Sequence, residues 1–245
     1  MSFLDHLEEL RWTLVKSLVV FLIGFILVAS FLERVSNWLR WPLDYGIRDN
    51  PDVLRLITTT PLAIFTVFMM VCFLGAIAMS LPFILYFVGQ FVAPALTKKE
   101  RGLLIPGLLL GTVLFVMGAL FAFFLLVPSV IKVSVYMNAL LGFEVLWSAD
   151  RYYSMLAWMV VGMGLAFQLP LAMQVPVYLD IITVEKYRSW RRIMILICTI
   201  AAAIITPTPD PFNMFLVALP LILLYELGVW LARVYTSKRV SQGRI

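Results

Sequence analysis

The chain has 245 residues, of which 62% are hydrophobic and only 13% are charged. A soluble domain has about 45–50% apolar and about 25% charged residues, so this composition indicates a protein whose solvent is a lipid bilayer. The net charge of +5 does not indicate a nucleic-acid-binding protein, because the basic residues lie in short clusters between apolar blocks. Both cysteines lie inside apolar blocks, which excludes a disulfide framework.

Six apolar blocks are long enough, or nearly long enough, to cross a membrane, which takes about 20 residues. The fifth block is short, since about 13 helical residues rise only about 20 Å against a hydrocarbon core of about 30 Å. Either this helix extends into 184–192 or the bilayer is thinner there. We therefore predict an all-α integral membrane protein, one domain over 1–245, with transmembrane helices at 14–32, 62–92, 103–127, 153–182, 193–205 and 212–231.

The distribution of lysine and arginine predicts that both termini lie in the cytoplasm. With the N-terminus inside, 13 of the 19 basic residues fall on the inner side, and the outer loops are the longer ones. Cytoplasmic loops carry such an excess of positive charge. The first outer loop, 33–61, holds Trp38, Trp41 and Tyr45, and we expect a partly ordered cap with aromatic anchors at the interface.

Prolines inside the apolar blocks predict bent helices. Pro82 lies in the second block, Pro170 and Pro176 lie in the fourth, and Pro220 lies in the sixth. Each removes a backbone donor and tends to bend its helix. The second and fourth blocks are also longer than a straight crossing needs, so we expect long, tilted helices that form a curved wall.

The first fourteen residues, MSFLDHLEELRWTL, predict an amphipathic lead-in helix at the cytoplasmic surface. Phe3, Leu7, Leu10 and Leu14 recur at helical spacing and form one apolar stripe. Acidic residues occupy the other side: Asp5, Glu8 and Glu9. The acidic side is either a solvated helix face or a docking site for a cationic partner.

The first inner loop contains a single acid, Glu100, among Lys98, Lys99 and Arg101. One interpretation is a local ion pair, which contributes little energy at an exposed site. The other is a second carboxylate on the face that holds Glu9. Two such carboxylates could each take one guanidinium of an arginine pair through bidentate, charge-assisted hydrogen bonds.

Polar groups inside the spans are few, and they include Gln90, Gln168 and Glu226. Each either forms a helix–helix hydrogen bond within the chain or marks a functional contact. Catalysis is poorly supported, because the chain has one histidine, His6, and lacks the HExxH, GxSxG and P-loop motifs. We expect no enzyme activity and no cofactor.

Several characteristic motifs follow one another along nearly the whole chain: FLDHLEELR at 3–11, TPLAIFTVF at 60–68, LPFILYFVGQFVAPALTKKER at 81–101, FQLP at 167–170, TPTPD at 206–210 and ALPLILLYELGVWLARVY at 218–235. With these motifs the sequence resembles the TatC family, the multispanning receptor subunit of the twin-arginine protein translocase. The resemblance implies a concave, glove-like wall of six helices that binds twin-arginine signal peptides of folded cargo at its cytoplasmic face. Matching the motifs position by position implies a signal-peptide site at Glu9, Glu100, Arg11, Lys98 and Arg101.

The resemblance also implies single-span partners of the TatA and TatB type, assembly into an oligomeric complex, and export driven by the proton-motive force across the cell inner membrane rather than the thylakoid membrane. The implied contacts with partner helices are Gln168, Thr206, Thr208 and Glu226. Gln168 stands where many family members have a glutamate, so a mechanism that needs a titrating carboxyl there does not carry over. The TPTPD turn has one residue more than the commoner form.

The alternative hypothesis is a small-solute secondary transporter with a site at Glu226 and Gln168 in the middle of the membrane. The absence of an internal repeat in the sequence counts against it.

Overall fold

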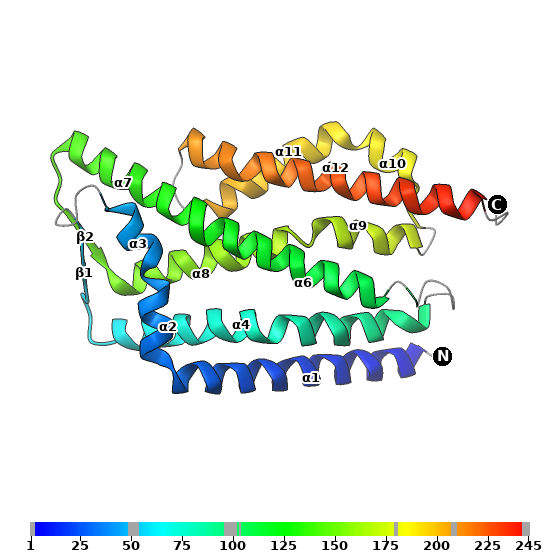
Figure 1. The fold of residues 1–245 in the computed structure, drawn as a ribbon, viewed down its shortest axis with the longest axis horizontal. Coiled ribbons are helices and arrows are strands. Elements are labelled where there is room, and N and C mark those ends of the chain that lie inside the picture. The colour runs from blue at the N-terminus through cyan, green and yellow to red at the C-terminus, as the bar shows by residue number, and fades with distance from the viewer. Residues whose placement is uncertain are drawn as a thin grey trace.

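Long helices lie side by side along one axis in the computed structural model, which describes residues 3–48, 54–95, 102, 104–178, 181–206 and 210–241. The start of the first helix and the end of the last one lie at the same end of the molecule (Figure 1). This agrees with an even number of membrane crossings and with two termini on one side. We call that end cytoplasmic and the opposite end outer, as the charge distribution predicts.

Helices α1 (Phe3–Ser30) and α4 (Ala63–Val92) form an antiparallel pair at one edge of the molecule (Figure 1). The described part of the predicted lead-in is continuous with the first span. A Cβ added to Gly24 would lie 3.3 Å from the Cα of Ala76. Small residues therefore bring the two backbones into close contact, as they do between membrane helices in general.

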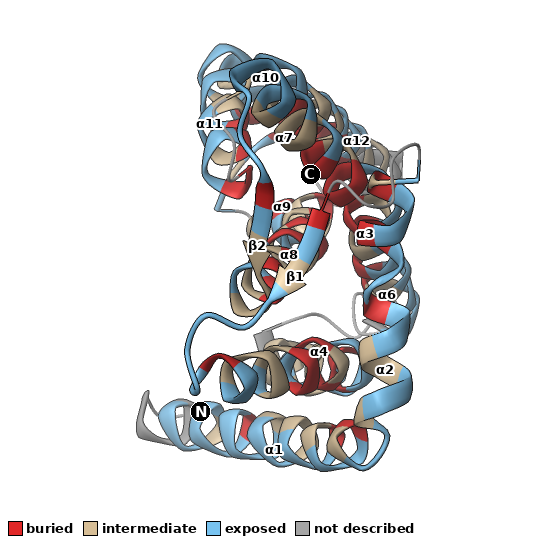
Figure 2. Cartoon of the chain, turned by 90° about the vertical axis from the view of Figure 1, so that its left-hand side faces the viewer, coloured by how far each residue is buried: buried red, intermediate tan, exposed pale blue. Residues whose placement is uncertain are grey.

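The described part of the first outer loop is folded, where the sequence predicted a partly ordered cap. It contains α2 (Leu32–Leu39), α3 (Trp41–Gly46) and the strand β1 (Leu54–Ile57). Strand β1 pairs in parallel with β2 (Val145–Ser148), and Figure 2 shows the two strands side by side. The sequence did not predict these strands.

The helix that carries the predicted third span, 103–127, continues well beyond that range. Helix α6 (Leu104–Phe121) passes through one π-helical turn, η2 (Ala122–Leu126), into α7 (Val127–Leu141). Pro128 suggests an end to the helix, but it lies in the first turn of α7, where a missing N–H removes no necessary hydrogen bond. Helix α7 ends instead at Gly142, whose φ of 73° forms a left-handed cap.

The fourth span is broken where its prolines predicted a bend. Helix α8 (Ala149–Ala166) ends before Phe167, and α9 (Leu169–Tyr178) begins one residue before Pro170. In a continuous helix Pro170 would have no N–H to offer the carbonyl of Ala166, and its ring would clash with that carbonyl, which explains the position of the break. Pro82, Pro176 and Pro220 lie inside helices that continue through them.

The last part of the chain forms α10 (Val184–Ser189), α11 (Arg191–Ile205) and α12 (Pro211–Ser241). Helix α11 does not extend into the preceding segment as one helix, because Trp190 separates it from α10. At 15 residues, α11 is about 22 Å long. Among the described residues, five helices are long and apolar enough to cross a membrane, and α11 is not one of them. The sixth crossing therefore stays a prediction.

The core lies where α6, η2, α7 and α8 meet, and it extends to α12 and the outer cap. Its largest fully buried side chains include Leu126, Ile131, Tyr152, Leu156 and Met159. The hydroxyl of Tyr152 donates to the carbonyl of Leu39 at 2.9 Å and ties α8 to α2. Helix α1 contributes little to this core, and only 11% of its apolar window is buried. Its exposed side chains are therefore suited to contact lipid.

We predict that Gly118→Ala destabilises the protein, because the added Cβ would lie 2.6 Å from the backbone carbonyl oxygen of Met163. Overpacking of this kind costs about 1–3 kcal/mol. The matched control is Gly107→Ala on the same helix, where an added Cβ meets no atom within 4 Å. Thermal unfolding in detergent should show a lower midpoint for the first variant alone, and equal midpoints would contradict the close packing of α6 on α8.

Candidate functional site

Glu9 lies near the cytoplasmic end of α1 and is half-buried. Its Oε2 atom is shielded from solvent, and its backbone carbonyl accepts a hydrogen bond from the hydroxyl of the buried Thr13 at 2.9 Å. Arg11, in contrast, is exposed. A carboxylate that is partly withdrawn from water interacts more strongly with a cation than a fully exposed one does.

The pairing of α1 with α4 shows where Glu9 lies relative to the first inner loop. The rings of Phe21 and Phe73 are 5.8 Å apart and those of Phe25 and Phe68 are 6.2 Å apart, so the helices run antiparallel in this register. Following α1 back to Glu9 reaches the level of about Leu85 on α4, since both helices rise about 1.5 Å per residue. Helix α4 continues for about two more turns to Val92, and the inner loop follows it. Its predicted site residues lie outside the described residues: Lys98, Glu100 and Arg101.

A groove of about 330 Å³ runs between α4, α6 and α9 in the cytoplasmic half of the molecule. Gln168 lies at one end of this groove, and Tyr178 lies at the other. The walls between them are almost entirely aliphatic and glycine: Leu85, Val88, Gly89, Leu108, Gly111 and Leu171. Such a surface suits the apolar part of a ligand or of a partner helix.

Gln168 lies in the break between α8 and α9 and is half-buried. Its Nε2 donates to the carbonyl of Gly111 on α6 at 2.9 Å. A Cβ on Gly111 would come within 2.8 Å of the Leu171 Cδ1 and 3.2 Å of the Gln168 Oε1. Glycine at this position therefore allows the close approach that the hydrogen bond requires.

Gln174 is a second structural amide in the fourth span, and sequence reasoning missed it. It is buried, and its Nε2 donates at 3.0 Å both to the carbonyl of Pro170 and to that of Gly228 on α12. The side chain of Gln174 therefore joins α9 to α12 on the cytoplasmic side of the break. Its signal in the sequence is a second glutamine in the same apolar block, six residues after Gln168.

Glu226 forms an ion pair within the chain. Its Oε2 accepts a hydrogen bond from Arg191 Nη2 at 2.6 Å, which joins α12 to the start of α11. Both side chains remain more than 40% exposed, so the pair lies at the surface of the cytoplasmic half. An external partner helix can still approach it.

Thr206 is buried at the outer end of α11, where its hydroxyl donates to the carbonyl of Ala202 at 2.9 Å. Thr208 lies outside the described residues. The three described residues thus have separate polar contacts. Gln168 bonds α6, Thr206 bonds a carbonyl of its own helix α11, and Glu226 bonds Arg191 at the start of α11. No hydrogen bond in the described part of the chain links one of them to another.

A pair of buried tyrosines fixes the short helix α10 at the cytoplasmic end. The hydroxyl of Tyr187 donates to the carbonyl of Met173 on α9 at 3.0 Å, and that of Tyr225 on α12 donates to the carbonyl of Tyr187 at 2.5 Å. Burial raises the pKa of Tyr187, so this phenol remains a neutral donor at physiological pH. These bonds hold α9, α10 and α12 together beside the groove.

The arrangement is suited to binding. In the ranges that the structure describes, no group of three His, Cys, Asp or Glu side chains is placed to hold a metal ion. The described residues present the carboxylate of Glu9 near the cytoplasmic end of α1 and an aliphatic groove that has Gln168 at one end.

The family model described as Sec-independent protein translocase protein (TatC) matches residues 5–220. The chain belongs to the TatC family. It is 34% identical over 241 residues to the TatC of Aquifex aeolicus, covering 98% of both chains. It is also 34% identical to the TatC of Synechocystis, covering 95% of this chain and 88% of the relative.

A crystal structure of a twin-arginine translocase receptor, TatC, is similar to this fold with a TM-score of 0.79 at 34% identity. The alignment covers 94% of this chain and 99% of the solved chain. The protein is therefore a multi-pass membrane subunit of the Sec-independent, twin-arginine protein translocase. The resemblance in the sequence is confirmed, and the alternative of a small-solute transporter has no support.

We predict that Gln174→Met destabilises the TatC-family fold, because it removes the amide that bonds the carbonyls of Pro170 and Gly228. Two lost hydrogen bonds should cost about 1–2 kcal/mol, since single bonds between membrane helices are worth about 0.6 kcal/mol on average and buried orphaned carbonyls add to the loss. Unfolding by a denaturing detergent measures the effect. Gln90→Met is the control, since Gln90 is exposed and bonds only the hydroxyl of Tyr86. A control variant destabilised as strongly as the test variant would contradict the assignment.

Proposed function

We propose that this chain is the receptor and scaffold of the translocase, and that it binds the arginine pair of export signal peptides at its cytoplasmic face. The observation that carries the proposal is the half-buried carboxylate of Glu9 in the cytoplasmic part of α1, about two turns short of the level at which α4 ends. The relative of known crystal structure is itself described as the translocase receptor, which supports the same role here.

The proposed chemistry uses one carboxylate for each arginine. Glu9 takes one guanidinium and Glu100 takes the other, each through two parallel N–H···O bonds, which a planar guanidinium forms and an ammonium group does not. Arg11, Lys98 and Arg101 flank these acids in the sequence. We assign them the role of orienting the carboxylates and of limiting binding to peptides that offer two guanidinium groups.

We predict that the purified protein binds an Arg-Arg signal peptide at least about tenfold more tightly than its Lys-Lys version, a difference that corresponds to about 1.4 kcal/mol. Glu9→Gln and Glu100→Gln should each remove most of this preference, because a neutral amide cannot accept a bidentate guanidinium bond with full charge. Fluorescence anisotropy of a labelled peptide in detergent measures both affinities.

The matched control is Glu8→Gln, which makes the same change in charge at the neighbouring exposed position of α1. It should retain the preference for arginine. Equal affinity of the wild-type protein for the two peptides would refute bidentate recognition. If the Glu8 and Glu9 variants lost the preference for arginine equally, binding would depend on general electrostatic attraction and not on a specific carboxylate.

We further propose that TatA- and TatB-type single-span subunits bind this chain through Gln168, Thr206, Thr208 and Glu226. Gln168 lies at an apolar groove and Glu226 lies at the surface, where contacts between membrane helices depend on packing and on polar pairs. The complex then exports folded cargo across the cell inner membrane at the expense of the proton-motive force. Because Gln168 does not titrate, its contact should not depend on pH between about 5 and 8.

We predict that Gln168→Leu reduces co-purification of the single-span partners at least about threefold, while Gln90→Leu leaves it unchanged. The amide of Gln168 lies at the groove, whereas Gln90 lies outside the residues that line it. The thermal midpoint of each variant separates loss of the partner from loss of the bond to Gly111. Full partner recovery with the leucine variant would remove Gln168 from the proposed contact.

A further inference from the structure

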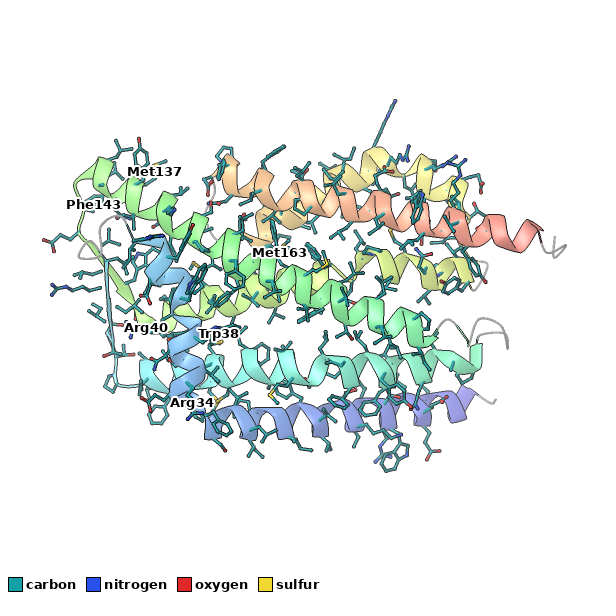
Figure 3. All side chains as sticks on the ribbon, viewed as in Figure 1. Arg34, Trp38, Arg40, Met137, Phe143 and Met163 are labelled. Atoms are coloured by element: carbon teal, nitrogen blue, oxygen red, sulfur yellow. The ribbon has the colours of Figure 1, made fainter. Side chains whose placement is uncertain are left out.

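Five rings in mutual contact lie toward the outer end of the molecule and form the outer aromatic patch, in which all but the buried Phe123 are exposed: Trp38, Trp41, Tyr45, Phe123 and Phe124. Trp41 stacks on Tyr45 with ring centroids 5.0 Å apart, and Trp38 stacks on Phe123 at 5.4 Å. Trp38 is 62% exposed and Phe124 is 43% exposed. Figure 3 shows Trp38 and Arg40 on opposite sides of the same outer segment.

Lys132 adds a positive charge to this surface. It is the only charged residue in the apolar stretch Ile105–Leu141. Its Nζ lies 5.1 Å from the centroid of the Tyr45 ring, and the side chain is exposed. Lys132 forms no ion pair with any described carboxylate.

Packing of α3 on α7 holds the charge and the rings in place. A Cβ on Gly46 would lie 2.8 Å from the Ile131 Cγ2, so the neighbours of these two residues, Tyr45 and Lys132, are brought together. Arg48 follows in a turn whose backbone N–H returns to the carbonyl of Tyr45. It is exposed and also forms no ion pair with a described residue.

We propose that the outer aromatic patch with Lys132 binds an anionic phospholipid of the outer leaflet. The phosphate lies against the Lys132 ammonium and the Tyr45 hydroxyl, and Arg48 adds positive charge on the outer side. The acyl chains lie along Trp41, Phe124 and Trp38. Tryptophan and tyrosine concentrate at the level of the lipid headgroups, which places the charge and the rings at matching depths.

The chemistry favours a lipid over an unoccupied surface. The described residues offer the exposed Lys132 only the face of an aromatic ring and no carboxylate, and a basic group beside apolar side chains attracts anionic lipids. Asp44, which precedes Tyr45 in the chain, lies about 100° around α3 from Tyr45 and about 60° from Trp41, and it forms no ion pair with Lys132. An external anion with apolar chains satisfies both the cation and the exposed rings.

The test uses the full chain reconstituted in bilayers that contain photoreactive phosphatidylglycerol or phosphatidylcholine, with the same diazirine-bearing acyl chain at the same mole fraction. Mass spectrometry then quantifies labelling of the peptides that carry Trp38, Trp41 and Phe124. We expect at least about fivefold more labelling of these peptides by phosphatidylglycerol, a difference of the size that one charge-assisted contact provides.

Lys132→Gln should bring the ratio of the two lipids close to one, and Lys132→Arg should retain the preference. Lys16→Gln, which removes an exposed charge from α1, should leave the ratio at the patch unchanged. Equal labelling by the two lipids in the wild-type protein overturns the proposal. So does a preference that survives Lys132→Gln, or a patch labelled by neither lipid because a second copy covers it.

Discussion

Backbone groups inside a bilayer must find their hydrogen-bond partners within the protein, and the break in the fourth span is where this requirement shapes the molecule. The chain leaves helical geometry at Phe167, shortly before Pro170. Two glutamines then supply donors around the break. Gln168 reaches the carbonyl of Gly111 on α6, and Gln174 reaches those of Pro170 and Gly228. Both amides also line the groove between α4, α6 and α9.

Close packing through small residues complements these bonds, since lipid provides no hydrophobic force between helices. Gly118 on α6 meets the backbone of Met163, and Gly24 on α1 meets that of Ala76 on α4. Helix α1 is attached mainly through α4 and leaves most of its apolar surface exposed. The result is a wall with free edges, which suits a subunit that assembles with other membrane helices and does not enclose a pore by itself.

The two ends of the wall have different chemistry. The cytoplasmic end carries the half-buried carboxylate of Glu9, and the outer end carries an aromatic patch with Lys132, the one charged residue of the stretch Ile105–Leu141. The first arrangement suits recognition of guanidinium groups, and the second suits attachment to lipid. Both depend on long helices that place their ends at fixed, opposite levels.

The sequence by itself determined that the protein spans a membrane, which family it belongs to, and nearly where its second span lies, because hydropathy and motifs are local properties of the chain. It also predicted a bend in the fourth span, since a proline acts on its own helix. Only the tertiary structure decided that Gln174 bonds Gly228, that Glu226 pairs with Arg191, and that β1 pairs with β2. These partners are far apart in the chain and meet through packing. The helix continues past Pro128 for a related reason: the π-helical turn before it positions the proline where no donor is needed.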